Sequence, residues 1–321
     1  MNTTVPTFLR TLRLGEPTLC DNLAMVPLFA NSNSKPDYIT LEAGLKSGLL
    51  EVEELESGAS VNDILLRNKS DLLALLFEGE EFIGAMQNRV LNVSILANAH
   101  SKQTLPVSCV EAGRWHHEHD ERERQKFNIA NRMHYARGRA LENSAVSRNL
   151  ETQKMYRGDQ SKVWDDIAIR SRRMNAESPT AASDALYVSA EKRINEYTKS
   201  FVHQPEQVGS LFLIDDAVSG LEIFANEITH RNMLLRLIRS YALDAINAEE
   251  TGPGAKDRVP KVSVQRARKA ADSFVKQLSE SWTKEFNGVC LGRNVRFKDD
   301  GITGGALVHN ETLFHLCAFA A

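Results

Sequence analysis

The chain has 321 residues and a formal net charge of −3, with 42% hydrophobic and 25% charged residues. This length can bury one large core or two modest ones, and the composition is ordinary for a globular protein. The charge balance gives no indication of nucleic-acid or membrane-surface binding.

From the sequence we expect neither a targeting segment nor a redox-active cysteine pair. No apolar run reaches the length of a membrane span, and residues 1–19 lack a charged region followed by an apolar one. The four cysteines are far apart, with no CxxC pair and no zinc-type Cys/His cluster. We therefore expect a cytoplasmic protein with reduced thiols, no membrane association and no metal site.

The first seventy residues predict a β-rich start. Residues 41–49 have helical character and follow Thr40, a residue type that often caps a helix. Short apolar or alternating runs bounded by turn residues predict strands at 7–14, 23–30, 38–40, 50–55 and 61–67.

Residues 72–115 are the most strand-like part of the chain. We expect strands at 72–77, 82–96 and 105–111, separated by turn and loop sequences. Several positions in and beside these strands are polar where a plain sheet would be apolar: Gln87, Asn88, Arg89, Asn92, Ser108, Cys109, Glu111 and Arg114. Alternation places Gln87 and Arg89 on one face of the strand at 82–96, and Cys109 and Glu111 on one face of the strand at 105–111.

Two interpretations of these polar residues stay open. Asparagine and glutamine are poor strand formers, and a buried arginine needs partners. The residues therefore form either a ligand-binding site or a structural network in which Glu111 neutralises Arg89 or Arg114.

From residue 116 to 201 the composition changes, and we predict an inserted helical region. Residues 116–121 read HHEHDE, which we interpret as a solvated loop because the HExxH order of a helical metal site is absent. Residues 122–148 are rich in arginine and are expected either to be partly mobile or to cover a partner. Amphipathic helices are predicted at 159–173 and from about 180 to 201.

The last third alternates hairpins and helices. Residues 208–224 and 304–319 predict hairpins, 226–248 and 263–282 predict long helices, and 249–261 predict a flexible loop. Ser240 and Asp244 lie four apart on one helix and are expected to bond neighbouring strands. His309 and His315 flank the second hairpin turn, where they could face each other. We expect one of them to lie near the Gln87–Glu111 sheet.

These elements together predict an α+β fold in one unit. Its mainly antiparallel core is expected to combine N-terminal and C-terminal strands, with the helical insertion and two long C-terminal helices packed on it.

The chain resembles the domain family named for its association with ADP-ribosylglycohydrolases and rhodanese-type phosphatases. The stretches that carry the resemblance span nearly the whole chain, and the most specific are GEEFIGAMQNRVLNVSIL (79–96) and LPVSCVEAGRW (105–115). Weaker matches are SPTAA (178–182), VGSLFLID with GLEIF, LLRLIRSYALDAI (234–246) and GGALVHNETLFHLCAF (304–319). The resemblance implies a link to NAD or ADP-ribose processing through neighbouring genes, without a catalytic mechanism.

Three kinds of chemistry are compatible with the polar residues, and no cofactor follows from any of them. The first is nucleophilic catalysis by Cys109, although Arg114 stands one residue short of a phosphatase Cx5R loop. The second is hydrolysis of a nucleotide or ADP-ribose conjugate with Glu111 as general base. There Arg89 and Arg114 would hold phosphate, and further ligand contacts would come from Gln87, Asn88, Asn92, His309 and His315.

The third is a non-catalytic role as an assembly protein, acting as a homo-oligomer or as the partner of an ADP-ribose-processing or defence system. Between these, we favour binding of a phosphorylated, NAD-derived ligand.

Overall fold

A computed structural model describes residues 5–30, 35–55, 60–114, 126–251 and 263–320. Its fold is α+β, as the sequence predicts, and every strand pair is antiparallel except β4 with β7. Seven helices lie in the described residues: α1 (Val5–Leu9), α2 (Leu41–Ser47), α3 (Ala136–Thr152), α4 (Gln160–Arg173), α5 (Asp184–Ser200), α6 (Glu227–Thr251) and α7 (Val264–Glu280).

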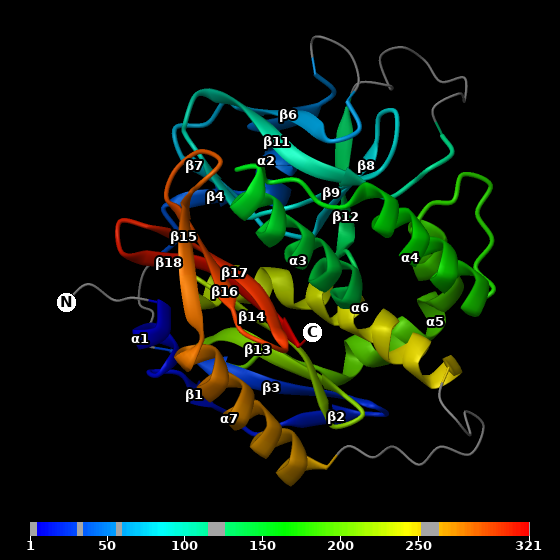
Figure 1. Cartoon of the computed structure of the whole chain (residues 1–321), viewed down its shortest axis with the longest axis vertical. Coiled ribbons are helices and arrows are strands. Elements are labelled where there is room, and N and C mark those ends of the chain that lie inside the picture. The colour runs from blue at the N-terminus through cyan, green and yellow to red at the C-terminus, as the bar shows by residue number, and fades with distance from the viewer. Residues whose placement is uncertain (1–4, 31–34, 56–59, 115–125, 252–262, 321) are drawn as a thin grey trace.

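The largest sheet has nine strands and joins the two ends of the chain (Figure 1). Its spatial order is β1 (Arg13–Leu14), β3 (Leu23–Phe29), β13 (Gln207–Ile214), β14 (Ala217–Phe224), β18 (Thr312–Ala320), β17 (Ile302–His309), β16 (Arg293–Lys298) and β15 (Trp282–Asn287), with β2 (Thr18–Cys20) paired to β3. The expected hairpins at 208–224 and 304–319 are therefore confirmed, and they pair with each other through β14 and β18.

Two smaller sheets are built from the middle of the first half of the chain. The six-stranded sheet runs β12 (Phe127–Met133), β8 (Glu80–Gly84), β9 (Arg89–Leu91), β11 (Ser101–Cys109), β6 (Asp63–Asn68) and β5 (Leu50–Glu53). The three-stranded sheet runs β10 (Ile95–Ala97), β7 (Leu73–Leu76) and β4 (Tyr38–Thr40). In Figure 1 both lie at the top, above the nine-stranded sheet.

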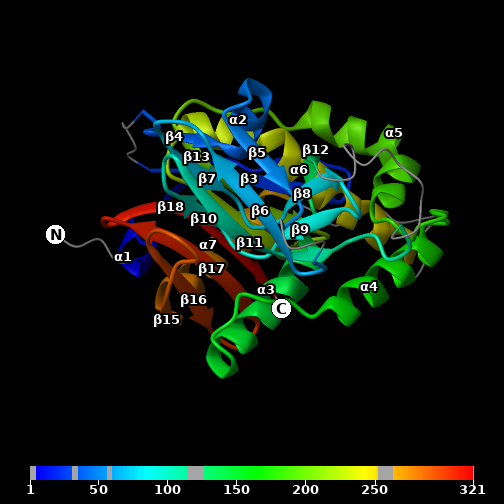
Figure 2. The same cartoon turned by 90° about the horizontal axis from the view of Figure 1, so that it is seen from above.

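Helix α6 lies in the middle of the molecule, between the nine-stranded sheet and β12 (Figure 1). Its apolar residues are buried on several sides, as expected of a helix enclosed in a core. Figure 2 shows α4 and α5 along one side of the sheets. On the outer face of the large sheet, α7 and α1 pack together over a second apolar cluster. No helix in the described ranges is long and apolar enough to cross a membrane.

Several predicted elements are wrong in extent or type. The expected strand at 7–14 is α1 followed by the short β1, because Val5 and Leu9 lie one helical turn apart and are buried near α7. The expected single strand at 82–96 is divided into β8, β9 and β10. Its first break is a turn at Gly84 and Ala85, both in the left-handed region. At Gly84 a Cβ atom would lie 2.9 Å from the Lys126 carbonyl oxygen.

The region 116–201 is not purely helical, because β12 occupies 127–133 and pairs with β8. Its asparagines and arginine weaken the strand signal, but Arg132 is buried against Glu81 at 2.9 Å, so tertiary contacts override propensity. The strands β15 and β16 were not predicted either. The loop expected at 249–261 begins inside α6, and residues 252–262 lie outside the described residues, as do 115–125 with the histidine-rich segment.

Candidate functional site

The polar residues singled out in the sequence meet where the β8–β9 turn reaches the end of β11. We call this group the Glu111 cluster: Gln87, Asn88, Arg89, Cys109, Glu111 and Arg114. It contains the ion pair that the sequence indicated, with Arg114 as the partner. The Arg114 Nε atom lies 2.9 Å from Glu111 Oε2. The amide of Asn88 donates to the same oxygen at 3.1 Å, and the Thr180 hydroxyl donates to Oε1 at 2.6 Å. Both carboxylate oxygens are therefore engaged.

Beneath this pair, Gln87, Arg89 and Cys109 are fully buried. The Gln87 amide donates to the Glu111 carbonyl oxygen at 2.8 Å, and Arg89 donates to Gln87 Oε1 at 3.1 Å. The Cys109 thiol donates to the Glu111 carbonyl oxygen at 3.1 Å. Burial raises the pKa of this thiol, and the Arg89 charge only partly opposes the rise. Cys109 is therefore a protonated, inaccessible thiol in this structure, which is the opposite of an activated nucleophile.

Arg114 joins three parts of the cluster. Besides its ion pair with Glu111, its Nη2 atom donates to the Gly84 carbonyl at 2.9 Å and to Asn88 Oδ1 at 3.0 Å. Its side chain is 19% exposed, against 6% for Glu111. Arg114 is thus the member of the charged pair that solvent can reach.

The loop after α4 is attached to this cluster by main-chain bonds. Gly113 donates to the Thr180 carbonyl at 2.9 Å, and Ser183 donates to the Val110 carbonyl at 2.9 Å. Between this loop and α4 lies an open hollow of about 560 Å³, which we call the Ser178 pocket: Ile167, Ala168, Ser171, Arg172, Asn175, Ala176, Glu177, Ser178 and Ala181. Its volume falls in the range of small-molecule sites, and its wall mixes apolar and polar residues as such sites do.

Asn92 belongs to a different group of hydrogen-bonded residues, which lies beside α3. Its Oδ1 atom accepts from Ser108 at 3.0 Å, and the Ser108 hydroxyl also contacts Glu142 Oε2 at 2.6 Å. Burial raises the pKa of Glu142, although the Ser108 hydrogen bond lowers it. The Asn92 amide also donates to the Tyr156 carbonyl at 3.3 Å, which links this group to a surface hollow.

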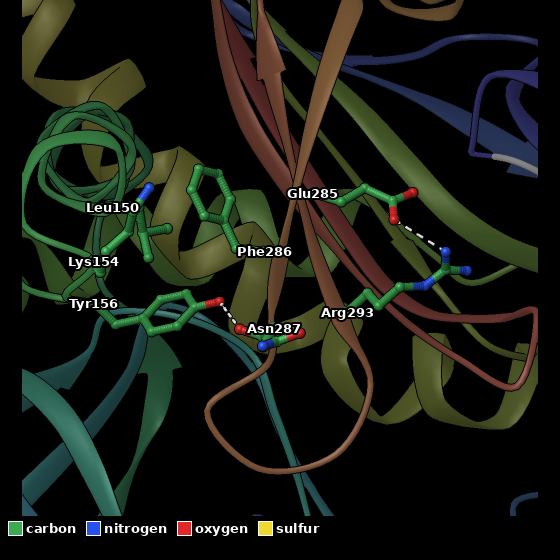
Figure 3. Close-up of a pocket in the computed structure, with 7 residues that line it drawn as sticks. All are labelled: Leu150, Lys154, Tyr156, Glu285, Phe286, Asn287 and Arg293. Atoms are coloured by element: carbon green, nitrogen blue, oxygen red, sulfur yellow. Dashed lines mark hydrogen bonds and ion pairs between the residues drawn. The ribbon is translucent and has the colours of Figure 1, made fainter.

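That hollow, of about 490 Å³, lies between the end of α3 and the β15–β16 hairpin (Figure 3). The Tyr156 hydroxyl donates to the Asn287 carbonyl, and Arg293 pairs with Glu285 at 3.0 Å, as Figure 3 shows. Burial raises the pKa of Tyr156 to about 12. Arg293 also pairs with Glu311 at 3.2 Å, so the arginine of this hollow is already neutralised.

The two histidines of the last hairpin separate. His315 is buried, and its Nδ1 atom lies 2.7 Å from the Ser94 hydroxyl, so one C-terminal histidine does lie against the predicted region. His309 is half-buried at the hairpin tip, where it contacts Asn310 at 3.1 Å. Across the strands His315 stands opposite Leu307, so the two histidines do not face each other.

Ser94, His315 and Glu222 form a hydrogen-bonded series that has the composition of a hydrolytic triad. The His315 Nε2 atom lies 3.3 Å from Glu222. All three side chains are buried, and the Ser94 oxygen already accepts the Glu78 amide at 2.9 Å. Because the three side chains are buried and hydrogen-bonded, this series joins the two sheet systems.

The series is part of a larger set of buried charges that the sequence analysis missed. We call it the buried ionic core, and its pairs are Glu78–Arg296, Glu80–Arg236, Glu81–Arg132 and Glu222–Arg139. The sequence EGEE at 78–81 predicts a turn and gives no sign of burial. The signal that could have revealed the set is charge within apolar strands, such as Glu222 between Leu221 and Ile223.

Ser240 and Asp244 of α6 are hydrogen-bonded as expected, but only one bonds a strand end. Ser240 donates to the His134 carbonyl, which directly follows β12, at 2.6 Å. Asp244 instead pairs with Arg170 of α4 at 2.6 Å. Among the residues with described positions, no group of three or more His, Cys, Asp or Glu side chains could hold a metal ion.

Comparison with protein families matches residues 11–319 to the ARG and Rhodanese-Phosphatase-superfamily-associated Protein domain, ARPP-1. The chain belongs to the ARPP-1 family. No curated protein and no solved structure matches it. In this ARPP-1 protein, the stretches 79–96, 105–115 and 178–182 that carried the resemblance all contribute residues to the Glu111 cluster or to the rim of the Ser178 pocket.

Proposed function

We propose that this ARPP-1 protein binds a phosphorylated, nucleotide-type ligand of the ADP-ribose class in the Ser178 pocket. One observation carries the proposal: the stretches 79–96 and 105–115 meet in the Glu111 cluster, and Glu111 bonds Thr180 of the third stretch, 178–182, which lines a small-molecule-sized pocket. The family description adds an ADP-ribose context.

The pocket offers the groups that such a ligand needs. Ile167 and Ala176 provide an apolar floor for a base, and Ser171 and Asn175 can hydrogen-bond sugar hydroxyls. Arg172 is exposed at the rim and supplies a guanidinium for phosphate, since its Nε atom bonds only the Ala168 carbonyl.

The Glu111 cluster then acts as the support of the pocket. Glu111 accepts a hydrogen bond from Thr180 and pairs with Arg114. Gln87 and Arg89 are hydrogen-bonded to each other in the buried layer beneath this pair. In this proposal Glu111 is a positioning residue. A general base must reach the substrate, whereas Glu111 is buried outside the lining of the Ser178 pocket and its oxygens hold Thr180, Asn88 and Arg114.

A second candidate is a purely structural or assembly role for the same region. It is favoured by the satisfied hydrogen bonds of Glu111 and its burial, which a structural network also produces. The two candidates differ in one measurable property, because only the first requires the Ser178 pocket to accept a ligand.

Calorimetric titration with ADP-ribose, NAD and AMP tests the proposal, with Ala168→Phe as the blocking variant. Ala168 is exposed on α4 and lines the pocket, so a phenyl ring fills space without entering the core. Ala43→Phe is the matched control, because Ala43 is an exposed alanine on α2, away from the pocket.

We expect wild type and Ala43→Phe to bind at least one of these compounds, and Ala168→Phe to bind it about tenfold or more weakly, the effect of about 1.4 kcal/mol. Equal binding by all three proteins, or no binding to wild type, would reject the pocket and leave the structural role.

A further inference from the structure

A second pocket lies on the other side of α4, away from the Ser178 pocket. It has a volume of about 500 Å³ and is enclosed by the start of α3, α4, α6 and the β13–β14 turn. We call it the arginine pocket. Its polar lining consists of Arg137, Arg170, Arg173, Asp166, Asp244, Asn247 and Ser219, and its apolar wall includes Ile169, Ile214 and Val218.

The floor of this pocket is an ion network centred on Arg170. Its Nε atom lies 2.9 Å from Asp166, its Nη1 atom lies 2.6 Å from Asp244, and its guanidinium covers the Tyr135 ring at 4.2 Å. Arg170 is buried, so these contacts fix its position. Its charge is therefore fully used within the protein.

The two carboxylates are used as well. Asp166 also accepts the Tyr135 hydroxyl at 2.8 Å, and Asp244 also accepts the Arg137 main-chain amide at 2.7 Å. This second bond engages the Arg137 amide in the first turn of α3. Asp244 has both oxygens engaged, whereas Asp166 is bonded through Oδ2.

Arg137 and Arg173 are the uncompensated charges of the pocket. Both are exposed, one on α3 and one on α4, and neither guanidinium has a hydrogen-bond or carboxylate partner within the described ranges. Guanidinium groups bind phosphate oxygens in pairs of parallel hydrogen bonds, so two arginines on different helices can hold one diphosphate between them.

We propose that the arginine pocket binds the diphosphate group of a small phosphorylated molecule, with Arg137 and Arg173 as the anion-binding residues. Asp166 and Asp244 fix Arg170 in the floor, so the positive charge available to a ligand comes from Arg137 and Arg173. The apolar wall of Ile169, Ile214 and Val218 leaves room for an organic part beside the phosphates. This site does not depend on the ligand proposed for the Ser178 pocket.

The order of residues along α4 separates the two sites. Arg173 lines the arginine pocket, whereas its neighbour Arg172 lines the Ser178 pocket. The same substitution at adjacent positions therefore removes one positive charge from one pocket or from the other.

Inorganic pyrophosphate is the probe, and its affinity is measured by calorimetric titration of the full chain. We expect saturable binding to wild type and about tenfold weaker binding to R137A/R173A, because the loss of charged hydrogen bonds to phosphate lowers the affinity by at least this factor. Ser219→Asp, which places a carboxylate on the opposite wall, is expected to weaken binding similarly. Because these side chains lie at the surface, the variants are expected to melt at the wild-type temperature.

Arg148→Ala is the matched control, because Arg148 is an exposed arginine three turns further along α3. It is expected to bind pyrophosphate as wild type does. The proposal is overturned if wild type shows no saturable binding or if R137A/R173A binds normally. It is also overturned if Arg172→Ala weakens binding as strongly as the double variant, because the anion would then occupy the Ser178 pocket.

Discussion

The buried ionic core and the Glu111 cluster use the same residue types in different surroundings. In the core, Glu222 and Arg139 have side chains that are 0% and 1% exposed. In the cluster, Glu111 is equally paired, but its partner Arg114 is 19% exposed, and a pocket lies across the attached loop. A buried carboxylate–arginine pair is therefore not evidence of function by itself, and a neighbouring pocket is what separates the two regions.

The core also shows how tightly its charges are packed. Gly79, at φ +88°, lies against Arg139, and a Cβ atom there would stand 2.1 Å from the arginine Cδ. This close approach places the loop of Glu78 to Glu81 directly over Arg139, which bonds the His134 carbonyl at 3.0 Å. The result is a set of closely packed charges that holds the 78–81 loop, α3 and the end of β12 together.

The largest expected effect is at Arg139. Arg139→Ala leaves Glu222 buried without its main compensating charge, and the free energy of unfolding should fall by about 3–5 kcal/mol. Urea denaturation followed by circular dichroism measures this change. A loss below about 1 kcal/mol, the scale of a surface pair, would show that the pair is not buried as described.

A smaller effect is expected at Glu111, because solvent reaches Arg114. Glu111→Gln should lower the free energy of unfolding by about 2 kcal/mol, the scale of a hydrogen bond to a charged group, and should also weaken ADP-ribose binding through the Thr180 loop. Denaturation and titration of one sample measure both quantities. If stability falls as much as in Arg139→Ala, the distinction between the two regions is wrong.

Glu142 is a buried carboxyl group without an arginine partner among the described residues, so its substitution measures the effect of burial on stability. Because burial raises its pKa, the folded state prefers the protonated carboxyl, and ionisation above the folded pKa destabilises the fold. Glu142→Gln should then be more stable than wild type by on the order of 1 kcal/mol at pH 8. The gain should vanish as the pH falls below about 4.3, the ordinary value for glutamate. Thermal melts across this pH range are the measurement, and a pH-independent difference would contradict the assignment.

The smallest effect is expected at His309, which is half-buried beside the tip of the last hairpin, away from both regions. His309→Ala should change the free energy of unfolding by less than about 0.5 kcal/mol and leave ligand binding unchanged. Denaturation compared with the wild type is sufficient. A clear loss of ADP-ribose binding would bring His309 back into the site.

The sequence predicted the elements whose periodicity follows their burial, and missed those shaped by long-range contacts. Helix α6 and the hairpins were predicted because their apolar patterns are local properties. Strand β12 was missed because Arg132 is stabilised by Glu81, more than fifty positions earlier. The sequence also identified the polar residues near Glu111. It did not reveal the Thr180 hydrogen bond or the Ser178 pocket, because both are formed by a loop about seventy residues later.

The most direct test of the central claim is hydrogen exchange of the full chain with and without ADP-ribose. Our account predicts that the ligand slows exchange in α4 and in residues 174–183, while the buried ionic core stays unchanged because it is already protected. Protection confined to other segments, or no change at a saturating concentration of ADP-ribose, would contradict a ligand site in the Ser178 pocket.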